Sequence, residues 1–353
     1  MGRSVRTRRS DDSGARAGPT LADIAREAGV STATVSRVLN DPDSVRPVRA
    51  DRVRKAIAEL GYLPDGAARA LASRRSMTIG AVIPTLDNAI FARGVEAFQT
   101  RLMAKGYSLL LASSAYDLAA EAALVETLLQ RRVDALMLVG LQHDPALLER
   151  LRGRGIPHVL CWAHDPAGRL PCVGFDNCRA AAAMARHLIG LGHRRIAMIA
   201  GLTRGNDRAR DRVDGVRMAL EEIGENLAPE AVIEVPYSYA EGRAAMKHLL
   251  ARATRPSAVI CGNDVLAIGA VLAARDAGLE VPGEISVSGF DDLPLAGEFA
   301  PALTTMRVPA EAMGEQAASY LVARLEGGPA MASGPIPPLT VELVVRNTTG
   351  AAP

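Results

Sequence analysis

The stretch Thr20–Asn40, TLADIAREAGVSTATVSRVLN, contains two short helical patterns that meet at Gly29, Val30 and Ser31. Apolar residues repeat at helical spacing in the first pattern, and Thr20 precedes it as a candidate N-cap. Gly29 suits a tight turn, because a residue without Cβ takes positive φ freely. Two short helices about such a turn are typical of a helix-turn-helix, whose second helix enters the major groove of DNA.

The second helical pattern has an inward and an outward face. Ser31 is its candidate N-cap, and Val35, Val38 and Leu39 form an apolar stripe that predicts burial. The outward residues, which would face the major groove, are Thr32, Ala33, Ser36 and Arg37.

A third helical segment follows. Val53, Ile57 and Leu60 share one face of it and are expected to close a small three-helix core, with Gly61 at its end. Three small helices without a nucleic-acid partner remain the alternative interpretation.

Charge is distributed unevenly along the chain. The first 75 residues contain 15 Lys or Arg and 9 Asp or Glu, whereas the remainder contains 26 basic and 30 acidic residues. The net charge of +2 therefore conceals a basic N-terminal part. Basic residues on a small module supply phosphate contacts and release counterions, so this distribution favours binding to DNA.

The composition indicates a globular chain with more than one domain. It has 353 residues, of which 48% are hydrophobic and only 3% aromatic. No run of about eighteen apolar residues occurs, and the Arg-rich segment 1–19 lacks the apolar core of a signal peptide. We therefore expect a cytoplasmic protein with a disordered basic tail and no membrane partner.

Cysteines and histidines show no metal-binding pattern. Cys161, Cys172, Cys178 and Cys261 form no CxxC pair and no zinc-like spacing with histidine, which predicts reduced thiols and no metal. No GxGxxG opens the first helix, and neither a GxxxxGK[ST] phosphate loop nor a GxSxG nucleophile turn occurs. We expect neither enzymatic activity nor a cofactor.

Beyond about residue 76, short apolar runs alternate with amphipathic helices, a pattern typical of parallel α/β sheets. The expected strands are 78–83, 108–111, 135–139, 158–161, 195–199, 232–235, 258–261 and 286–289. Helices are expected between nearly all of them, for example over 91–105, 119–131, 180–191, 207–223, 241–253 and 265–277. Ligands of such sheets bind beyond the carboxyl ends of the strands, so residues just after strands form the candidate site.

Several motifs occur in order between Thr20 and Arg346, namely TLADIAREAGVSTATVSRVLN, ELGYLPDGAARALASRRS, TIGAVIP, VGFDN, LGHRRIAMIAG, CGNDVLAIGA, VPGEISVSGFDD and LTTMRVP. With them the chain resembles the lactose-repressor (LacI/GalR) family of bacterial transcription regulators. The resemblance implies a small all-α helix-turn-helix headgroup and an α/β core with parallel sheets. That core would resemble periplasmic binding proteins, with two lobes around one cleft.

The resemblance also implies a domain organisation. A basic tail over 1–19 would precede a DNA-binding domain over 20–63, a hinge helix and linker over 64–76, an effector-binding and dimerisation core over 77–346, and a tail over 347–353. Lobe one would comprise about 77–175 and 308–325, and lobe two about 176–306 and 326–346. The chain would cross between them near Asp176, Asp291 and Val308.

On the DNA side, the resemblance implies that Thr32 and Ala33 meet base edges and that Arg37 reaches a guanine or a phosphate. The residues implied to bind phosphate are Thr20, Ser31 and Thr34, with local capping as the less favoured alternative for Thr34. In the hinge, Leu71 would be an apolar wedge in the minor groove, and Arg69 would flank it near phosphate.

In the cleft, the resemblance implies an effector site that draws on both lobes. Arg212 offers a guanidinium fork for a carboxylate, a phosphate or vicinal hydroxyls, and Asn263 and Asp291 follow strands. The residues expected from lobe one are Asn88, Ile90 and Phe91. A helix cap, an ion pair or core packing would explain any one of them, but their joint placement favours a ligand.

Trp162 stands where many sugar-responsive members have Asp, and its indole would either stack on a ligand or pack in the core. With VGFDN, it resembles the gluconate-type regulators of the family and implies a sugar acid. Arg208 and Arg210, close to Arg212, suit an acidic effector, although neutral-sugar members also use the matching Arg.

We therefore expect a homodimer that represses transcription from a near-palindromic double-stranded operator and is released by a small sugar or sugar acid. The tail after Val345 lacks leucine heptads, which favours a dimer over a tetramer. Two alternatives stay open: a corepressor-dependent repressor, and a periplasmic-type small-molecule binding protein without a role in gene regulation. The headgroup and the missing export signal oppose the second.

Overall fold

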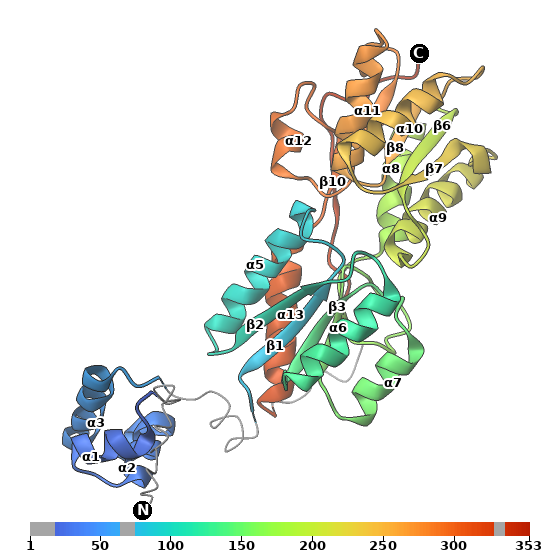
Figure 1. Cartoon of the computed structure of the whole chain (residues 1–353). Coiled ribbons are helices and arrows are strands. Elements are labelled where there is room, and N and C mark those ends of the chain that lie inside the picture. The colour runs from blue at the N-terminus through green and yellow to red at the C-terminus, as the bar shows by residue number, and fades with distance from the viewer. Residues whose placement is uncertain (1–17, 64–74, 328–335) are drawn as a thin grey trace, which may run out of the picture. The chain divides into compact units, whose positions relative to one another are not determined.

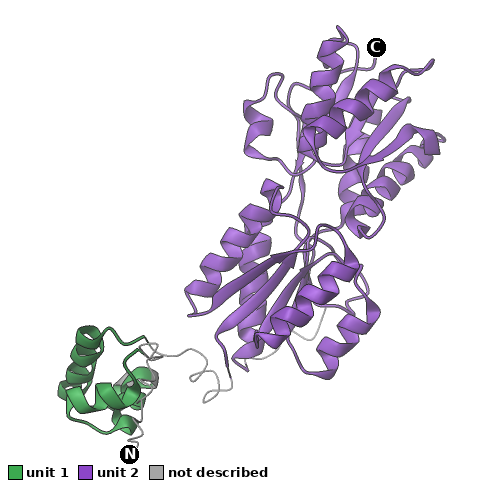
Figure 2. Cartoon of the chain, in the orientation of Figure 1, with its two compact units in different colours: residues 1–74 green, residues 75–353 purple. Residues whose placement is uncertain are grey.

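The computed structural model describes residues 18–63, 75–327 and 336–353, which belong to two compact units (Figures 1 and 2). The first unit falls within residues 1–74 and the second comprises residues 75–353. No helix in the described ranges is long and apolar enough to cross a membrane. The four cysteines form no disulfide.

The first unit consists of α1 (Leu21–Ala28), α2 (Thr32–Asn40), the 3-10 turn η1 (Pro42–Ser44) and α3 (Pro47–Leu60). α1 begins at a capping box, in which the Thr20 hydroxyl accepts the Asp23 amide and the Asp23 carboxylate accepts the Thr20 amide. Gly29 ends α1 at φ 59°, and the Ser31 hydroxyl caps α2. The predicted helix-turn-helix is confirmed.

Small apolar residues form the core of this unit. Its buried members are Ile24, Ala25, Ala28, Val35, Val38, Ala50, Val53 and Ala56. The prediction that Leu60 joins them was wrong, because Leu60 is 38% exposed and Tyr62 packs against the core instead. α3 has 14 residues, or about 21 Å, so its last turn extends past the shorter helices beside it.

The second unit contains two parallel sheets, as expected. Lobe one is built on a five-stranded sheet of order β2-β1-β3-β4-β5. Its strands are β1 (Thr78–Ile83), β2 (Ser108–Ser113), β3 (Ala135–Val139), β4 (His158–Cys161) and β5 (Cys172–Val173). On one face pack α5 (Ala89–Met103) and α13 (Ala310–Leu325), and on the other pack α6 (Leu118–Gln130) and α7 (Pro145–Gly153).

Lobe two is built on a four-stranded sheet of order β7-β6-β8-β9. Its strands are β6 (Ile196–Gly201), β7 (Val232–Val235, after the turn η2, Pro229–Ala231), β8 (Ala258–Cys261) and β9 (Ser286–Ser288). One face is covered by α8 (Asn177–Gly190) and α9 (Asp207–Glu221), and the other by α10 (Tyr239–Leu250) and α11 (Asp264–Asp276). The short α12 (Pro294–Glu298) follows β9.

The chain passes between the lobes more than once. It runs from β5 into α8, and from β10 (Thr305–Arg307), which pairs antiparallel with β11 (Glu342–Val344), into α13 (Figure 1). The crossing expected near Asp291 was wrong, because Ala296 of the following α12 packs into the core of lobe two.

His193 of the LGHRRI motif ties the base of lobe two together. Its ring is fully buried, with Nδ1 2.9 Å from the Ser257 hydroxyl and Nε2 3.0 Å from the Ser286 hydroxyl. Nε2 also lies 3.1 Å from the Gly350 carbonyl oxygen. Burial lowers the pKa of this imidazole. The motif therefore has a packing role in lobe two.

Candidate functional site

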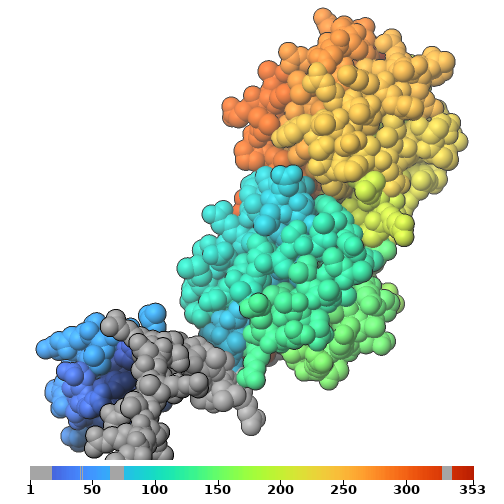
Figure 3. All heavy atoms as spheres, in the orientation of Figure 1, coloured from blue at the N-terminus to red at the C-terminus, as the bar shows by residue number. Residues whose placement is uncertain are grey.

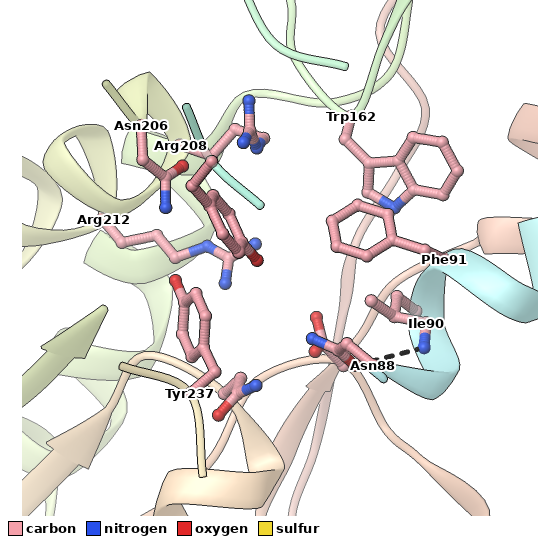
Figure 4. Close-up of a pocket in the computed structure, with 11 residues that line it drawn as sticks. Asn88, Ile90, Phe91, Trp162, Asn206, Arg208, Arg212 and Tyr237 are labelled. Carbon is pink, nitrogen blue, oxygen red and sulfur yellow. Dashed lines mark hydrogen bonds between the residues drawn. The ribbon is translucent and has the colours of Figure 1, made fainter. Parts of the chain in front are cut away.

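A cavity lies between the two lobes, beyond the carboxyl ends of strands from both sheets (Figure 4). It spans about 340 Å³ of space that no atom fills, part of which is open to solvent. Its lining consists of Asn88, Ile90, Phe91, Tyr116, Trp162, Asn206, Arg208, Arg212, Tyr237, Asn263 and Asp291. On the face shown in Figure 3, atoms of lobe one and lobe two lie against each other.

The structure brings all seven residues of the predicted effector site into this one lining. Tyr116, Asn206 and Tyr237 were missed, and Arg208 was named only as a neighbour of Arg212. The three missed residues follow β2, β6 and β7 by a few positions. The rule that sites lie beyond strand ends would have found them, had it been applied to every strand.

Lobe one contributes an apolar wall. Phe91, at the start of α5, meets the indole of Trp162 edge to face, with ring centroids 5.2 Å apart and planes at 62°. Trp162 adopts φ 61°, and its ring lies so close to Gly94 that a Cβ there would collide with it. The indole therefore packs in the core and lines the cavity at once. Its buried N–H has no hydrogen-bond partner within the described chain.

Three asparagines begin helices at the cavity. The side-chain oxygen of Asn88 caps α5 by accepting the Ile90 amide, and those of Asn206 and Asn263 cap α9 and α11 in the same way. Because each oxygen is engaged by its own helix, the amide nitrogen retains donor capacity. That of Asn263 is buried and unpartnered among the described residues.

Arg212 is held rigidly on α9. Its Nε donates to the side-chain oxygen of Asn177 at 2.9 Å, and Nη1 donates to the Gly262 carbonyl at 2.6 Å. The guanidinium stacks over the ring of Phe290, 3.8 Å from its centroid. Within the described residues it forms no ion pair, so its positive charge and its Nη2 donor remain for a ligand.

Arg208 and Asp207 connect lobe two to lobe one. Arg208 Nη1 donates to the Val139 carbonyl at 3.1 Å and pairs with the Asp207 carboxylate at 2.8 Å. The other oxygen of that carboxylate accepts the Leu141 amide at 2.6 Å. A Cβ on Gly140 would collide with both side chains, so the turn between Val139 and Leu141 accommodates the pair only because glycine stands there. We call this contact the interlobe latch.

Two buried carboxyl groups lie on the lobe-two side. Burial raises the pKa of Asp291 to about 7, against the opposing attraction of Arg212. Asp264 accepts hydrogen bonds from the Thr305 hydroxyl and the Leu293 amide, and burial raises its pKa well above the usual range. Asp264 is thus committed to the structure, whereas Asp291 lines the cavity.

Two tyrosines approach each other from opposite lobes. The rings of Tyr116 and Tyr237 lie 6.0 Å apart at 44°. Burial raises the pKa of both phenols, so both are neutral and able to donate or accept.

The first unit carries the second candidate surface. Thr32, Ala33 and Arg37 are exposed on α2. The hydroxyls of Ser31 and Thr34 lie 3.0 Å apart, and that of Thr20 belongs to the capping box. Two of the predicted DNA contacts, Arg69 and Leu71, lie outside the described residues.

The fold and cavity define a class: a small helix-turn-helix unit joined to a two-lobed domain of the periplasmic-binding-protein type. Residues 20–65 match the model of the bacterial regulatory proteins of the lacI family, and residues 185–349 match a periplasmic binding protein-like domain.

Full-length relatives agree. The chain is 37% identical, over 87% of its own length and 90% of the relative's, to the HTH-type transcriptional repressor PurR of Pectobacterium carotovorum subsp. carotovorum (strain PC1). It is also 37% identical, over 88% and 90%, to the HTH-type transcriptional regulator GntR of Pseudomonas aeruginosa. A structure of the lac repressor dimer bound to operator and the anti-inducer ONPF superposes with a TM-score of 0.85, at 28% identity over 95% of this chain and 100% of that one. The chain belongs to the lacI family of bacterial regulatory proteins, and it is a DNA-binding transcription regulator rather than an enzyme.

Proposed function

We propose that this protein is a homodimeric repressor that binds a near-palindromic operator and leaves it when a small sugar or sugar acid fills the cavity. The observation that carries effector binding is the pair of buried N–H groups on Trp162 and Asn263, which have no hydrogen-bond partner among the described residues. An unsatisfied buried donor costs about 1–3 kcal/mol, so a ligand that supplies acceptors is stabilised by satisfying them.

The exposed start of α2 supports DNA binding. Thr32 and Ala33 are placed to meet base edges in the major groove, and Arg37, one turn later, to reach a guanine or a phosphate. We assign Thr20, Ser31 and Thr34 to phosphate, which sets position without reading sequence.

An unpaired sheet edge supports the dimer. β2 ends the sheet of lobe one, and its Leu110 and Leu111 are 36% and 37% exposed. An edge strand that exposes leucines is a pairing hazard unless another surface covers it, and a second copy of lobe one would do so.

The domain organisation follows the same proposal. The DNA-binding domain covers 20–63 and the effector-binding and dimerisation core covers 77–346, joined by the segment 64–76 with Arg69 and Leu71. Effector binding alters how the two lobes meet, and the connecting segments carry this change to the headgroups. The coupling is reciprocal, so DNA weakens the binding of an inducer by the same factor.

Selection from a random double-stranded library tests the DNA half of the proposal. We expect an inverted repeat, bound by the wild type and bound about ten-fold or more weakly by Arg37→Ala. Arg217→Ala, which removes an exposed arginine from the core, is the charge-matched control and should bind normally. Failure to enrich any sequence, or enrichment of a single asymmetric half-site, would contradict the dimeric operator.

The effector half is tested by fluorescence anisotropy of the selected operator in the presence of sugars, sugar acids and nucleobases. A compound that raises the protein's melting temperature and weakens operator binding is the expected inducer. A compound that strengthens operator binding would establish the corepressor-dependent alternative. We place the protein in the bacterial cytoplasm, where its operator lies.

A further inference from the structure

The proposed function leaves the chemical class of effector open between neutral sugars and sugar acids. Resting on that function, we infer that the cavity is built for a monoanionic polyhydroxy acid. Its carboxylate is held at the N-terminus of α9, between Arg208 and Arg212.

Hydrogen-bond donors predominate in the cavity. The asparagine oxygens of Asn88, Asn206 and Asn263 cap helices, so these side chains offer mainly N–H groups. The indole N–H of Trp162 and the free Nη2 of Arg212 add two more donors. Asp291 is the only lining residue with a carboxylate. A ligand rich in acceptors, such as a carboxylate with hydroxyls, matches this set better than a ligand rich in donors.

Helix orientation adds positive potential. α5, α9 and α11 all begin at lining residues, so three helix N-termini point their partial positive charge at one small volume. Two donors, on Trp162 and Asn263, have no partner in the described part of the chain, and these residues are 2% and 1% exposed within the same lining. The cavity therefore contains N–H donors that a ligand can satisfy, in a positive electrostatic potential that favours an anion.

The balance of formal charge selects a monoanion. Arg208 is neutralised by Asp207 through the interlobe latch, whereas Arg212 forms no salt bridge among the described residues. Arg212 faces the buried Asp291, whose pKa burial raises to about 7, so this carboxyl can keep its proton when an anion binds. One unpaired arginine matches one carboxylate. A phosphate ester carries about −1.5 to −2 charges at neutral pH and would leave part of that charge buried without compensation.

The opposite wall fits the hydrocarbon face of a sugar acid. Figure 4 shows Asn206, Arg208 and Arg212 on one side of the cavity, and Ile90, Phe91 and Trp162 on the other. A hydroxylated carbon chain between these walls places its C–H groups against the aromatic rings and its carboxylate against the arginines.

Isothermal titration calorimetry on the full-length protein, with matched pairs of ligands, tests this inference. The probes are six-carbon and five-carbon aldonates and hexuronates, each beside its aldose, its lactone and its amide, together with hypoxanthine and glucose 6-phosphate. We expect at least one acid to bind ten-fold or more tightly than its uncharged partners. Tightest binding by a neutral sugar, a nucleobase or a phosphate ester would overturn the inference, as would binding by no acid of the panel.

The variant Asn206→Asp tests the same polarity without disturbing the helix. Aspartate caps helices as well as asparagine does, so α9 keeps its cap while the cavity gains a negative oxygen in place of a donor. We expect a ten-fold or greater loss of affinity for the acid and less than three-fold change for its neutral amide. Asn226→Asp makes the same charge change on the exposed surface of lobe two and should alter neither. Equal losses for acid and amide would refute carboxylate recognition at α9.

These outcomes separate the inference from the proposed function. If a neutral ligand releases the protein from its operator, the regulatory function stands and only the anionic class fails. If an acid binds tightly but leaves operator affinity unchanged, the class stands and the regulatory function fails.

Discussion

The two lobes share one architecture and contribute opposite chemistry to the cavity. Each is a parallel sheet covered by helices on both faces. Lobe one presents mainly Ile90, Phe91 and Trp162, whereas lobe two presents arginines, asparagines and Asp291. The contrast indicates a division of labour: lobe two selects the ligand by charge and hydrogen bonds, and lobe one covers it with an apolar wall.

Substitution of Arg212 should have the largest effect. Arg212→Ala removes a guanidinium that forms no salt bridge among the described residues, and it leaves the Asn177 and Gly262 oxygens without their donor. Because hydrogen bonds to charged groups contribute about 1.5–3 kcal/mol each, we expect effector affinity to fall about 100-fold or more. Operator affinity without effector should be unchanged. Calorimetry and operator anisotropy measure the two quantities.

Arg217→Ala serves as the control for that loss, since it removes an exposed arginine from the same helix. If Arg212→Ala still responded to effector at wild-type concentrations, lobe two would not be the selecting wall and the contrast between the lobes would fail.

The interlobe latch supplies the next largest effect. In Gly140→Ala, the new methyl group collides with Arg208 and Asp207, so the turn after β3 can no longer receive the ion pair. We expect the lobes to close less well and effector affinity to fall about ten-fold, in line with the loss of a buried charge-assisted bond. Small-angle scattering should show a more open core.

Gly155→Ala is the matched control for strain. Both glycines have positive φ, so both substitutions carry the backbone cost, but nothing lies within 4 Å of a Cβ at Gly155. A loss of affinity of the same size in both variants would mean that strain, rather than the latch, is responsible.

The same two walls show what sequence alone could predict. The strand-helix alternation predicted eight strands, and all eight are observed near the predicted bounds, because most strands of these parallel sheets are buried, continuous apolar runs. The short β5, β10 and β11 were missed, since strands of two or three residues leave too little pattern. The resemblance to a family then placed seven residues that the structure brings to one cavity.

What sequence could not predict depends on contacts between distant segments. The latch joins residues 139–141 to residues 207–208, and neither segment carries a pattern that indicates the other. The donor excess depends on which oxygens are used as helix caps, which becomes visible only once helix starts are known to the residue. The predicted burial of Leu60 was wrong because α3 is longer than the two helices that it packs against.

The titration of Asp291 predicts how the affinity of lobe two for an acidic ligand depends on pH. Its pKa is about 7 in the free protein, where Arg212 faces it and Asp264, Tyr116 and Tyr237 lie near enough to interact. A bound anion raises this pKa further by repulsion, so the complex holds more protons than the free protein near neutrality. Affinity for an acid should therefore fall several-fold between pH 6 and pH 8.

Asp291→Asn removes the titrating group and should flatten this dependence. Calorimetry in buffers of different ionisation enthalpy measures the proton uptake directly. A ligand hydroxyl can form a hydrogen bond with either protonation state of the Asp291 carboxyl. The charge of the ligand therefore determines whether protons are taken up or released on binding. Proton release on binding, with affinity rising between pH 6 and pH 8, would show that the ligand carries no negative charge.

Substitution of Trp162 in the apolar wall of lobe one should have the smallest effect on effector affinity. Trp162→Phe keeps an aromatic ring against Phe91 and Gly94 but removes the indole N–H, which has no partner among the described residues. A single neutral hydrogen bond contributes about 0.5–1.5 kcal/mol, so we expect effector affinity to fall only about two- to ten-fold. The melting temperature of the free protein should hold or rise, because an unsatisfied buried donor is removed. An unchanged affinity would mean that lobe one acts on the ligand through apolar contact alone, and the division between the lobes would then be complete rather than partial.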